Sequence, residues 1–256
     1  MTDRIETYDV TGVPSIEIVG QTGDIVIRAS DEPRVRVVLR GNAEAVEATQ
    51  IDASPGSVSV RSGESDGRFF DKRVDVIVTA PPGSYLKVNL AAGQVRVRAA
   101  LTEASITTGS ADVRVSEPVG TATIKVASGD VSFSEVVGDA YVASASGNIK
   151  IADARDLTVN TASGNVRIGE AERTISVKSA SGDVTVKRFG GTEIDVATMS
   201  GDTTIGLAPG IEVRASIKTL SGEFRNRIKP VECERTESMA LNVKSFSGDV
   251  TLRSAS

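Results

Sequence analysis

A triplet of serine, glycine and an acidic or amide residue recurs through the chain, and these residue types could do chemistry. Serine can act as a nucleophile, and aspartate can act as a base or bind calcium. Clear copies begin at Ser128, Ser146, Ser163, Ser181, Ser200, Ser221 and Ser247, with weaker copies at Gly23-Asp24, Gly93-Gln94 and Asp112. From Gln94 onward the third position advances by 18, 18, 18, 17, 18, 19, 21 and 26 residues. This near-constant period predicts stacked structural repeats.

A catalytic role for the serines requires a neighbouring base, and the sequence offers none. The 256 residues include no histidine, which removes the commonest general base and a common metal ligand. No copy of the triplet is set apart from the others by its surroundings. We interpret the serine column as hydroxyl groups that satisfy backbone groups at a corner. The sequence therefore predicts no catalytic residues, and we expect the protein not to be an enzyme.

The acidic column has a calcium interpretation and a structural one. Carboxylates stacked about 5 Å apart repel each other by about 1 kcal/mol per pair in water. Asn148 and Asn165 interrupt the charge, and a basic residue often follows two positions later, as at Arg96, Arg114, Lys150, Arg167 and Arg225. Calcium-binding solenoids instead use nonapeptide repeats that converge several carboxylates on each ion. The pattern favours a structural ladder, and no metal or cofactor is predicted.

The residues around each triplet alternate between apolar and polar, which is the period of a β-strand. Aligning the repeats produces apolar columns, one of which reads Ile124, Val142, Val159, Val177, Val196, Ile217 and Val243. Each repeat is therefore strand, tight corner and strand, and each strand pairs most economically with its equivalent one repeat away. The sequence predicts an all-β fold: a single-stranded parallel β-solenoid, or β-helix, with about 18 residues per coil.

The regularity changes along the chain and suggests two parts. Residues 1–80 are strand-rich but irregular, and we interpret them as an N-terminal β-layer that caps the solenoid. Pro81-Pro82-Gly83 marks the start of residues 81–256, the regular solenoid, as one continuous elongated domain. Residues 226–239 form a charged insertion that carries Cys233, a lone thiol with no histidine to activate it. The segment Leu241 to Arg253 is then expected to form the final coil.

Composition excludes several functions. The net charge is −5 and the pI is near 5.0, so a nucleic-acid-binding role lacks its electrostatic driving force. No stretch approaches 18 consecutive apolar residues, and Met1 to Glu6 contains no apolar signal segment. The sequence therefore predicts a cytoplasmic protein with no signal peptide and no membrane span.

The position before the serine grows toward the C-terminus. It reads Ala127, Ala145, Ala162, Ala180, Met199, Leu220 and Phe246. One interpretation is a corner that widens to suit the longer coils, and the other is an apolar patch for a partner or a second protomer. An end-to-end or face-to-face homo-oligomer through the C-terminal coils is accordingly one candidate mode of association.

The chain also resembles a known family. The segment Val74-Asp75-Val76-Ile77-Val78-Thr79-Ala80-Pro81-Pro82-Gly83, followed by repeated Ser-Gly-Asp-Val, resembles the bacterial DUF4097 family, which is labelled "putative adhesins". The resemblance implies a parallel β-solenoid with no established catalytic residues. The adhesin label implies exposure at the cell surface.

These observations favour a non-catalytic structural or interaction protein, a β-solenoid scaffold that presents repetitive faces to an unidentified protein or cell-envelope partner. The alternative is a carbohydrate-binding or carbohydrate-active β-helix protein, although the aromatic content of 4% leaves few rings for sugar stacking. An acyltransferase of the left-handed hexapeptide type is disfavoured, because the chain has neither a six-residue apolar period nor a histidine.

Overall fold

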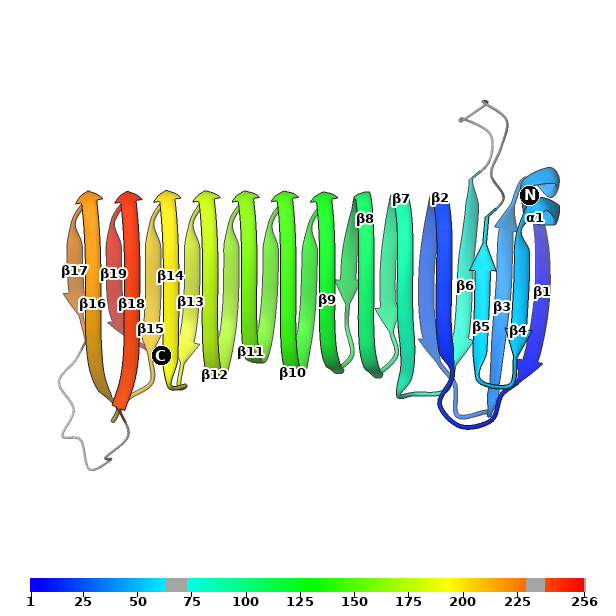
Figure 1. Cartoon of the computed structure of the whole chain (residues 1–256), viewed down its shortest axis with the longest axis horizontal. Helices are drawn as coiled ribbons and strands as arrows, with labels where there is room; N and C mark the ends of the chain where they lie inside the picture. Colours follow the sequence, from blue (N-terminus) through cyan, green and yellow to red (C-terminus); the bar gives the residue numbers. More distant parts are fainter. Residues whose placement is uncertain (63–72, 229–237, 256) are drawn as a thin grey trace. The chain divides into compact units, whose positions relative to one another are not determined.

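A computed structural model describes residues 1–62, 73–228 and 238–255 of the chain. The chain divides into two compact units, Met1–Gly129 and Asp130–Ser256. In both units, β-strands predominate, and most pair in parallel with the equivalent strand one coil away (Figure 1). The all-β parallel solenoid predicted from the alternating pattern is confirmed. The charged insertion and Cys233 lie largely or wholly in 229–237, outside the described residues.

The first unit contains an irregular portion followed by regular coils. In chain order its elements are β1 (Thr2–Asp9), β2 (Ser15–Ala29), β3 (Arg34–Gly41), α1 (Ala43–Ala48), β4 (Gln50–Ser54), β5 (Ser57–Arg61), β6 (Val74–Ala80), β7 (Ser84–Arg98), β8 (Leu101–Val115) and β9 (Val119–Ser128). β2, β7 and β8 pair in parallel register, so that Ile25, Val95 and Val113 form one buried column. In these segments polar residues alternate with buried β-branched residues, and β-branched side chains favour the extended backbone of a strand.

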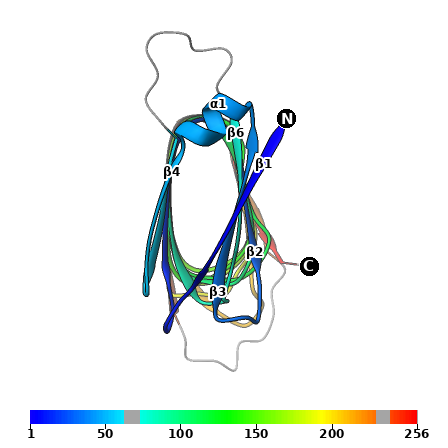
Figure 2. The ribbon, with the colours of Figure 1, turned by 90° about the vertical axis from the view of Figure 1, so that its right-hand side faces the viewer.

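Antiparallel pairs occur within residues 2–80. β3 pairs antiparallel with β1 and with β6, and β4 pairs antiparallel with β5. Pro55-Gly56, a turn dipeptide, separates β4 from β5. α1 begins after Asn42, whose side chain accepts a hydrogen bond from the Glu44 backbone N–H at 3.1 Å. Figure 2 shows β4 on one face, β1 and β3 on the other, and α1 at one narrow side between them.

The second unit consists of stacked coils. Its strands are β10 (Val131–Ser146), β11 (Ile149–Ser163), β12 (Val166–Ser181), β13 (Val184–Phe189), β14 (Glu193–Ser200), β15 (Thr203–Leu207), β16 (Glu212–Ser221), β17 (Phe224–Arg227), β18 (Ser238–Ser247) and β19 (Val250–Ser254). Val142, Val159, Val177 and Val196 lie side by side in successive coils and are fully buried. The apolar columns aligned from the sequence are thus the inner faces of the sheets.

The coils near the C-terminus do not stack in chain order. β18 pairs with β14 on one side and with β16 on the other, while β19 lies between β15 and β17 in the same way (Figure 1). The expectation that Leu241 to Arg253 forms the final coil was therefore wrong. The coil of β16 and β17 lies outside it, although it comes earlier in the chain.

The polarity of the inner positions explains this order. In β18 and β19, the inward residues Leu241, Val243 and Leu252 are apolar and buried. In β17, Asn226 stands beside Leu252, at a position where other coils carry an apolar residue. The Asn226 side chain is exposed and accepts a hydrogen bond from the Ile228 N–H at 3.0 Å, and burying its amide between two apolar coils would cost free energy. The apolar C-terminal coil takes the interior place instead.

Candidate functional site

The serine–glycine–acid triplets are corners, and their glycines are needed for geometry. Gly182 has a φ of +118°, which L side chains rarely adopt. A Cβ built on it would lie 2.3 Å from the carbonyl oxygen of Gly164 in the neighbouring coil. The same close contact occurs at Gly201, whose Cβ would lie 2.4 Å from the Gly182 oxygen. Neighbouring coils therefore contact each other through backbone atoms at this column, and any side chain larger than hydrogen would clash there.

The acidic and amide side chains that follow the glycines form a hydrogen-bonded ladder in the second unit. Each side-chain Oδ1 accepts a hydrogen bond from the backbone N–H at the equivalent position of the next coil. The acceptors, in spatial order, are Asp130, Asn148, Asn165, Asp183, Asp202 and Asp249, with donor–acceptor distances of 2.8 to 3.3 Å. The final donor is Glu223, whose own carboxylate pairs with Arg225 at 2.8 Å. The side-chain oxygen of asparagine accepts the same hydrogen bond as that of aspartate, which explains why both residue types occur in the column.

The hydroxyl groups that bond to the corner backbone are not those of the triplet serines. The triplet serines are exposed, whereas the residues two positions earlier are buried, except the half-buried Thr219. Ser144, Thr161 and Ser179 donate to the carbonyl oxygens of Ser146, Ser163 and Ser181, at 3.2 to 3.3 Å. The prediction that the triplet serines satisfy backbone groups at the corner was therefore wrong, because the hydroxyl residues two positions earlier make these hydrogen bonds. The signal in the sequence is a short hydroxyl residue two positions before the triplet serine, as at Ser144, Thr161 and Ser179.

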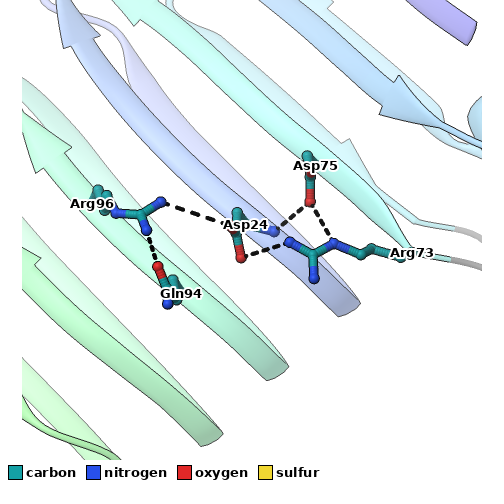
Figure 3. Close-up of polar contacts among 5 residues, drawn as sticks. All are labelled: Asp24, Arg73, Asp75, Gln94 and Arg96. Carbon is teal, nitrogen blue, oxygen red and sulfur yellow. Dashed lines mark hydrogen bonds and ion pairs between the residues drawn. The ribbon is translucent and has the colours of Figure 1, made fainter. Parts of the chain in front are cut away.

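A charged cluster occupies the corresponding corner of the first unit (Figure 3). The Arg73 guanidinium lies 3.1 Å from Asp24 and 3.0 Å from Asp75, and the Asp24 backbone N–H donates to Asp75 Oδ1 at 2.8 Å. Arg96 contacts Gln94 and approaches Asp24 at 3.6 Å. Hydrogen bonding to Asp75 raises the pKa of Arg73 above its usual value. Two carboxylates are thus neutralised by two guanidinium groups, which leaves no excess negative charge to hold a cation.

Arg73 and Asp75 of this cluster also line a hollow of about 470 Å³, together with Arg40. Arg40 and Arg73 face it, but Arg40 is bonded to Asp3 through two hydrogen bonds of 2.9 and 3.1 Å. Because both arginines are paired with carboxylates, an anionic ligand would have to displace an existing ion pair. Within the described ranges, no group of three or more cysteine, aspartate or glutamate side chains converges as a metal site requires.

Asp156 is the charged side chain among the buried residues that the structure describes. Arg173 Nε donates to its two oxygens at 2.8 and 2.7 Å, and the Thr174 hydroxyl donates at 2.6 Å. Hydrogen bonds from Arg173 hold the pKa of Asp156 below its usual value. A carboxylate held ionised by three donors is a poor general base, so this group stabilises a corner.

The apolar column beside the corners becomes an exposed patch in the second unit. Met199, Phe246 and Leu220 are 63%, 61% and 73% exposed, and they lie on the neighbouring strands β14, β18 and β16. Chain order hides this arrangement, because Phe246 lies between the other two. We call these three residues the apolar patch. Their exposure shows that these three side chains are not packed inside a widened corner.

The strand next to the patch, β16, forms an open end of the second unit. Among the described strands it pairs only with β18. Its inward residues Val213 and Ile217 are only partly covered, whereas their neighbours Met239 and Val243 on β18 are fully buried. β17 is exposed along its whole length. Unpaired strand edges with apolar inner faces are ready templates for association.

Comparison with known proteins places the chain in a family. A family model described as Toastrack DUF4097 matches residues 13–255. The chain belongs to this family. A "putative adhesin" from Bacteroides fragilis has a similar fold, with 13% identity, a TM-score of 0.56 and coverage of 98% of this chain and 97% of that one. A second from Parabacteroides distasonis has 13% identity, the same coverage and a TM-score of 0.49. Identities this low establish the Toastrack fold alone.

The remaining comparisons add no reaction or ligand. A search among curated proteins finds no match to the chain. Within the part of the chain that the structure describes, no helix has the length and apolarity needed to cross a bilayer.

Proposed function

We propose that this protein is a non-catalytic interaction module that binds a partner protein through the apolar patch. The observation that carries the proposal is the juxtaposition of Met199, Phe246 and Leu220, each more than 60% exposed, on three adjacent strands. Large apolar side chains exposed singly are ordinary, but a contiguous group on a rigid sheet is typical of an interface. The adhesin description of the Bacteroides fragilis neighbour agrees with a binding role.

The surroundings of the patch define the chemistry of its partner. Lys244 and Lys218 lie opposite each other on β18 and β16, two residues before Phe246 and Leu220, and both are exposed. Neither is ion-paired to a described residue. Like charges directly opposite each other in a sheet are destabilising, and a nearby carboxylate relieves the repulsion. The partner is therefore expected to present apolar side chains together with aspartate or glutamate.

A non-catalytic role is supported by what the polar groups do. The corner carboxylates and amides accept backbone hydrogen bonds, Asp156 is held by Arg173 and Thr174, and Asp24 and Asp75 are neutralised by arginines. Catalytic acids and bases need accessible groups with pKa values near the working pH. The described carboxylates with shifted pKa values, Glu6, Glu17, Asp3 and Asp156 among them, are instead shifted downward by cationic or hydroxyl donors.

The proposal is tested by photo-crosslinking in living cells. A photoreactive amino acid replaces Phe246 in one variant and Val137 in a matched control, since Val137 is also exposed, at 53%, but lies outside the patch. We expect a discrete protein adduct from position 246, and its loss when Met199 and Leu220 are changed to serine. Equal adducts at both positions, or none at 246, would overturn the proposal. A polysaccharide adduct at 246 would favour the carbohydrate-binding alternative.

A further inference from the structure

Strand β16 is complementary to an antiparallel copy of itself, and we propose that two copies of the protein pair through it. The pairing has its twofold axis at Ala215. It concerns the strand edge rather than the apolar patch, so it goes beyond the proposed partner and is tested separately. A symmetric dimer uses the same surface on both subunits, which for a strand edge requires antiparallel pairing.

The backbone of β16 has an edge available for this pairing. The Ser221 carbonyl accepts a hydrogen bond from the Gly248 N–H at 2.9 Å, so Ser221 directs its backbone groups toward β18. Alternate residues of a strand direct these groups to opposite edges. Glu212, Arg214, Ser216 and Lys218 therefore direct their N–H and C=O groups away from β18, where no described strand pairs with them.

The side chains match when the twofold axis passes through Ala215. Glu212 then stands opposite the partner's Lys218, and Lys218 opposite the partner's Glu212, which gives two opposite-charge pairs. On the inner side, Val213 meets the partner's Ile217 and Ala215 meets the partner's Ala215, so the half-buried Val213 and Ile217 and the exposed Ala215 of both copies are buried together. Glu212 and Lys218 can reorient because both side chains are exposed. The ion pair that Glu212 makes with Arg214 is long, at 3.8 Å, and therefore holds the carboxylate weakly.

Other registers are disfavoured by charge. Moving the axis to Ser216 brings Arg214 opposite the partner's Lys218 twice, and moving it to Arg214 brings that arginine opposite itself. Shifting the pairing of the two strands by a single residue would place inward-facing residues of one copy opposite outward-facing residues of the other. Like charges directly opposite each other are destabilising in a sheet, so the register at Ala215 is specified.

Head-to-tail pairing with the other edge described for the chain, β1, is also disfavoured. The half-buried side of β1 carries Arg4, Glu6 and Tyr8, which are already bonded to one another. These polar side chains do not match Val213, Ala215 and Ile217.

Charge reversal tests the pairing in the full chain. Sedimentation equilibrium should give twice the 26.7 kDa of one chain for the wild type. Glu212→Lys or Lys218→Glu alone should raise the dimer dissociation constant about tenfold or more, because each change turns two attractive pairs into repulsive ones. The double variant should restore the dimer. A monomeric wild type, filaments, or no rescue by the double variant would overturn the inference.

Disulfide crosslinking tests the register, in a background with Cys233→Ser. Ala215→Cys should form an intermolecular disulfide on mild oxidation, because residues directly opposite each other have Cβ atoms about 5 Å apart. Val213→Cys alone should not crosslink, whereas Val213→Cys with Ile217→Cys should. Crosslinking of Val213→Cys alone would contradict the register. The patch variant with serine at Met199, Phe246 and Leu220 should remain dimeric, so failure of either proposal leaves the other testable.

Discussion

Two edge strands, β1 in the first unit and β16 in the second, differ in the polarity of the side chains on their half-buried sides. Each pairs with a single described strand, β3 and β18 respectively. β1 turns Arg4, Glu6 and Tyr8 toward the covered side, where Arg4 donates to the carbonyl of Thr49 at 2.8 Å. β16 turns Val213 and Ile217 toward the covered side and leaves them partly exposed. The polar side chains of β1 are hydrogen-bonded within the chain, whereas β16 leaves apolar side chains partly exposed.

The glycine corners should show a larger effect than either edge strand, because neighbouring coils contact each other through them. Gly182→Ala combines a φ of +118° with a Cβ 2.3 Å from backbone oxygen, so we expect a loss of about 3 kcal/mol or more of unfolding free energy. Gly210→Ala retains a positive φ of +80° but meets open space, and should lose about 1 kcal/mol. Denaturant unfolding measures both. Equal losses would show that backbone contact between coils is not what requires glycine.

Because β18 is an inner strand and β16 an outer one, alanine substitutions on these two strands should reduce the free energy of unfolding by different amounts. Leu241 is fully buried between Ile194 and Ala215, so Leu241→Ala should cost about 3 kcal/mol. Ile217 is only partly covered, so Ile217→Ala should cost about 1 kcal/mol in the monomer. Urea titrations at concentrations below the dimer dissociation constant make the comparison. A larger cost at Ile217 would place β16 inside and contradict the observed order.

The polar edge can be made to resemble the apolar one. Arg4→Leu keeps an aliphatic side chain but removes the donor to the Thr49 carbonyl, and should cost about 1 to 2 kcal/mol. The variant should also associate more readily, because β1 then offers an apolar inner residue. Thermal unfolding and light scattering provide the two readouts. Unchanged stability would show that the Arg4 hydrogen bonds contribute little to this end.

A smaller effect is expected from pH at the same edge. Burial, together with the hydrogen bond to Glu6, raises the pKa of Tyr8 to about 12 from its ordinary value of 10. Between these values the folded protein holds a proton that the unfolded chain has lost, so stability present below pH 10 is lost as pH rises through about 12. Wild type should therefore lose more stability than Tyr8→Phe between pH 10 and 12. Parallel pH profiles of the two proteins would contradict the assignment.

Much of the fold could be predicted from the sequence, because its repeats are locally consistent. Valine columns such as Val142, Val159 and Val177 identify the inner face, and glycine with aspartate identifies the corner. The coil order could not be obtained by assuming that neighbours in the chain are neighbours in space. The available signal was Asn226, a polar residue in an apolar column, which fits only at an end.

The candidate surfaces were only partly predictable. The column Met199, Leu220 and Phe246 was visible, but its continuity depends on β18 lying between β14 and β16. The covered side of β1 could not be foreseen either, because its antiparallel pairing with β3 sets which residues face inward. The hydroxyl role of Ser144 was missed because the adjacent triplet serine is the more regular feature.

Hydrogen exchange of β16 and β18, read by mass spectrometry, tests the central claim most directly. At concentrations below the dimer dissociation constant, residues 238–247 should be strongly protected, because β18 is paired on both sides. Residues 212–221 should exchange faster there, and should gain protection as the protein concentration is raised. Slower exchange in 212–221 than in 238–247 at low concentration would contradict the account, since β16 would then not be the open edge.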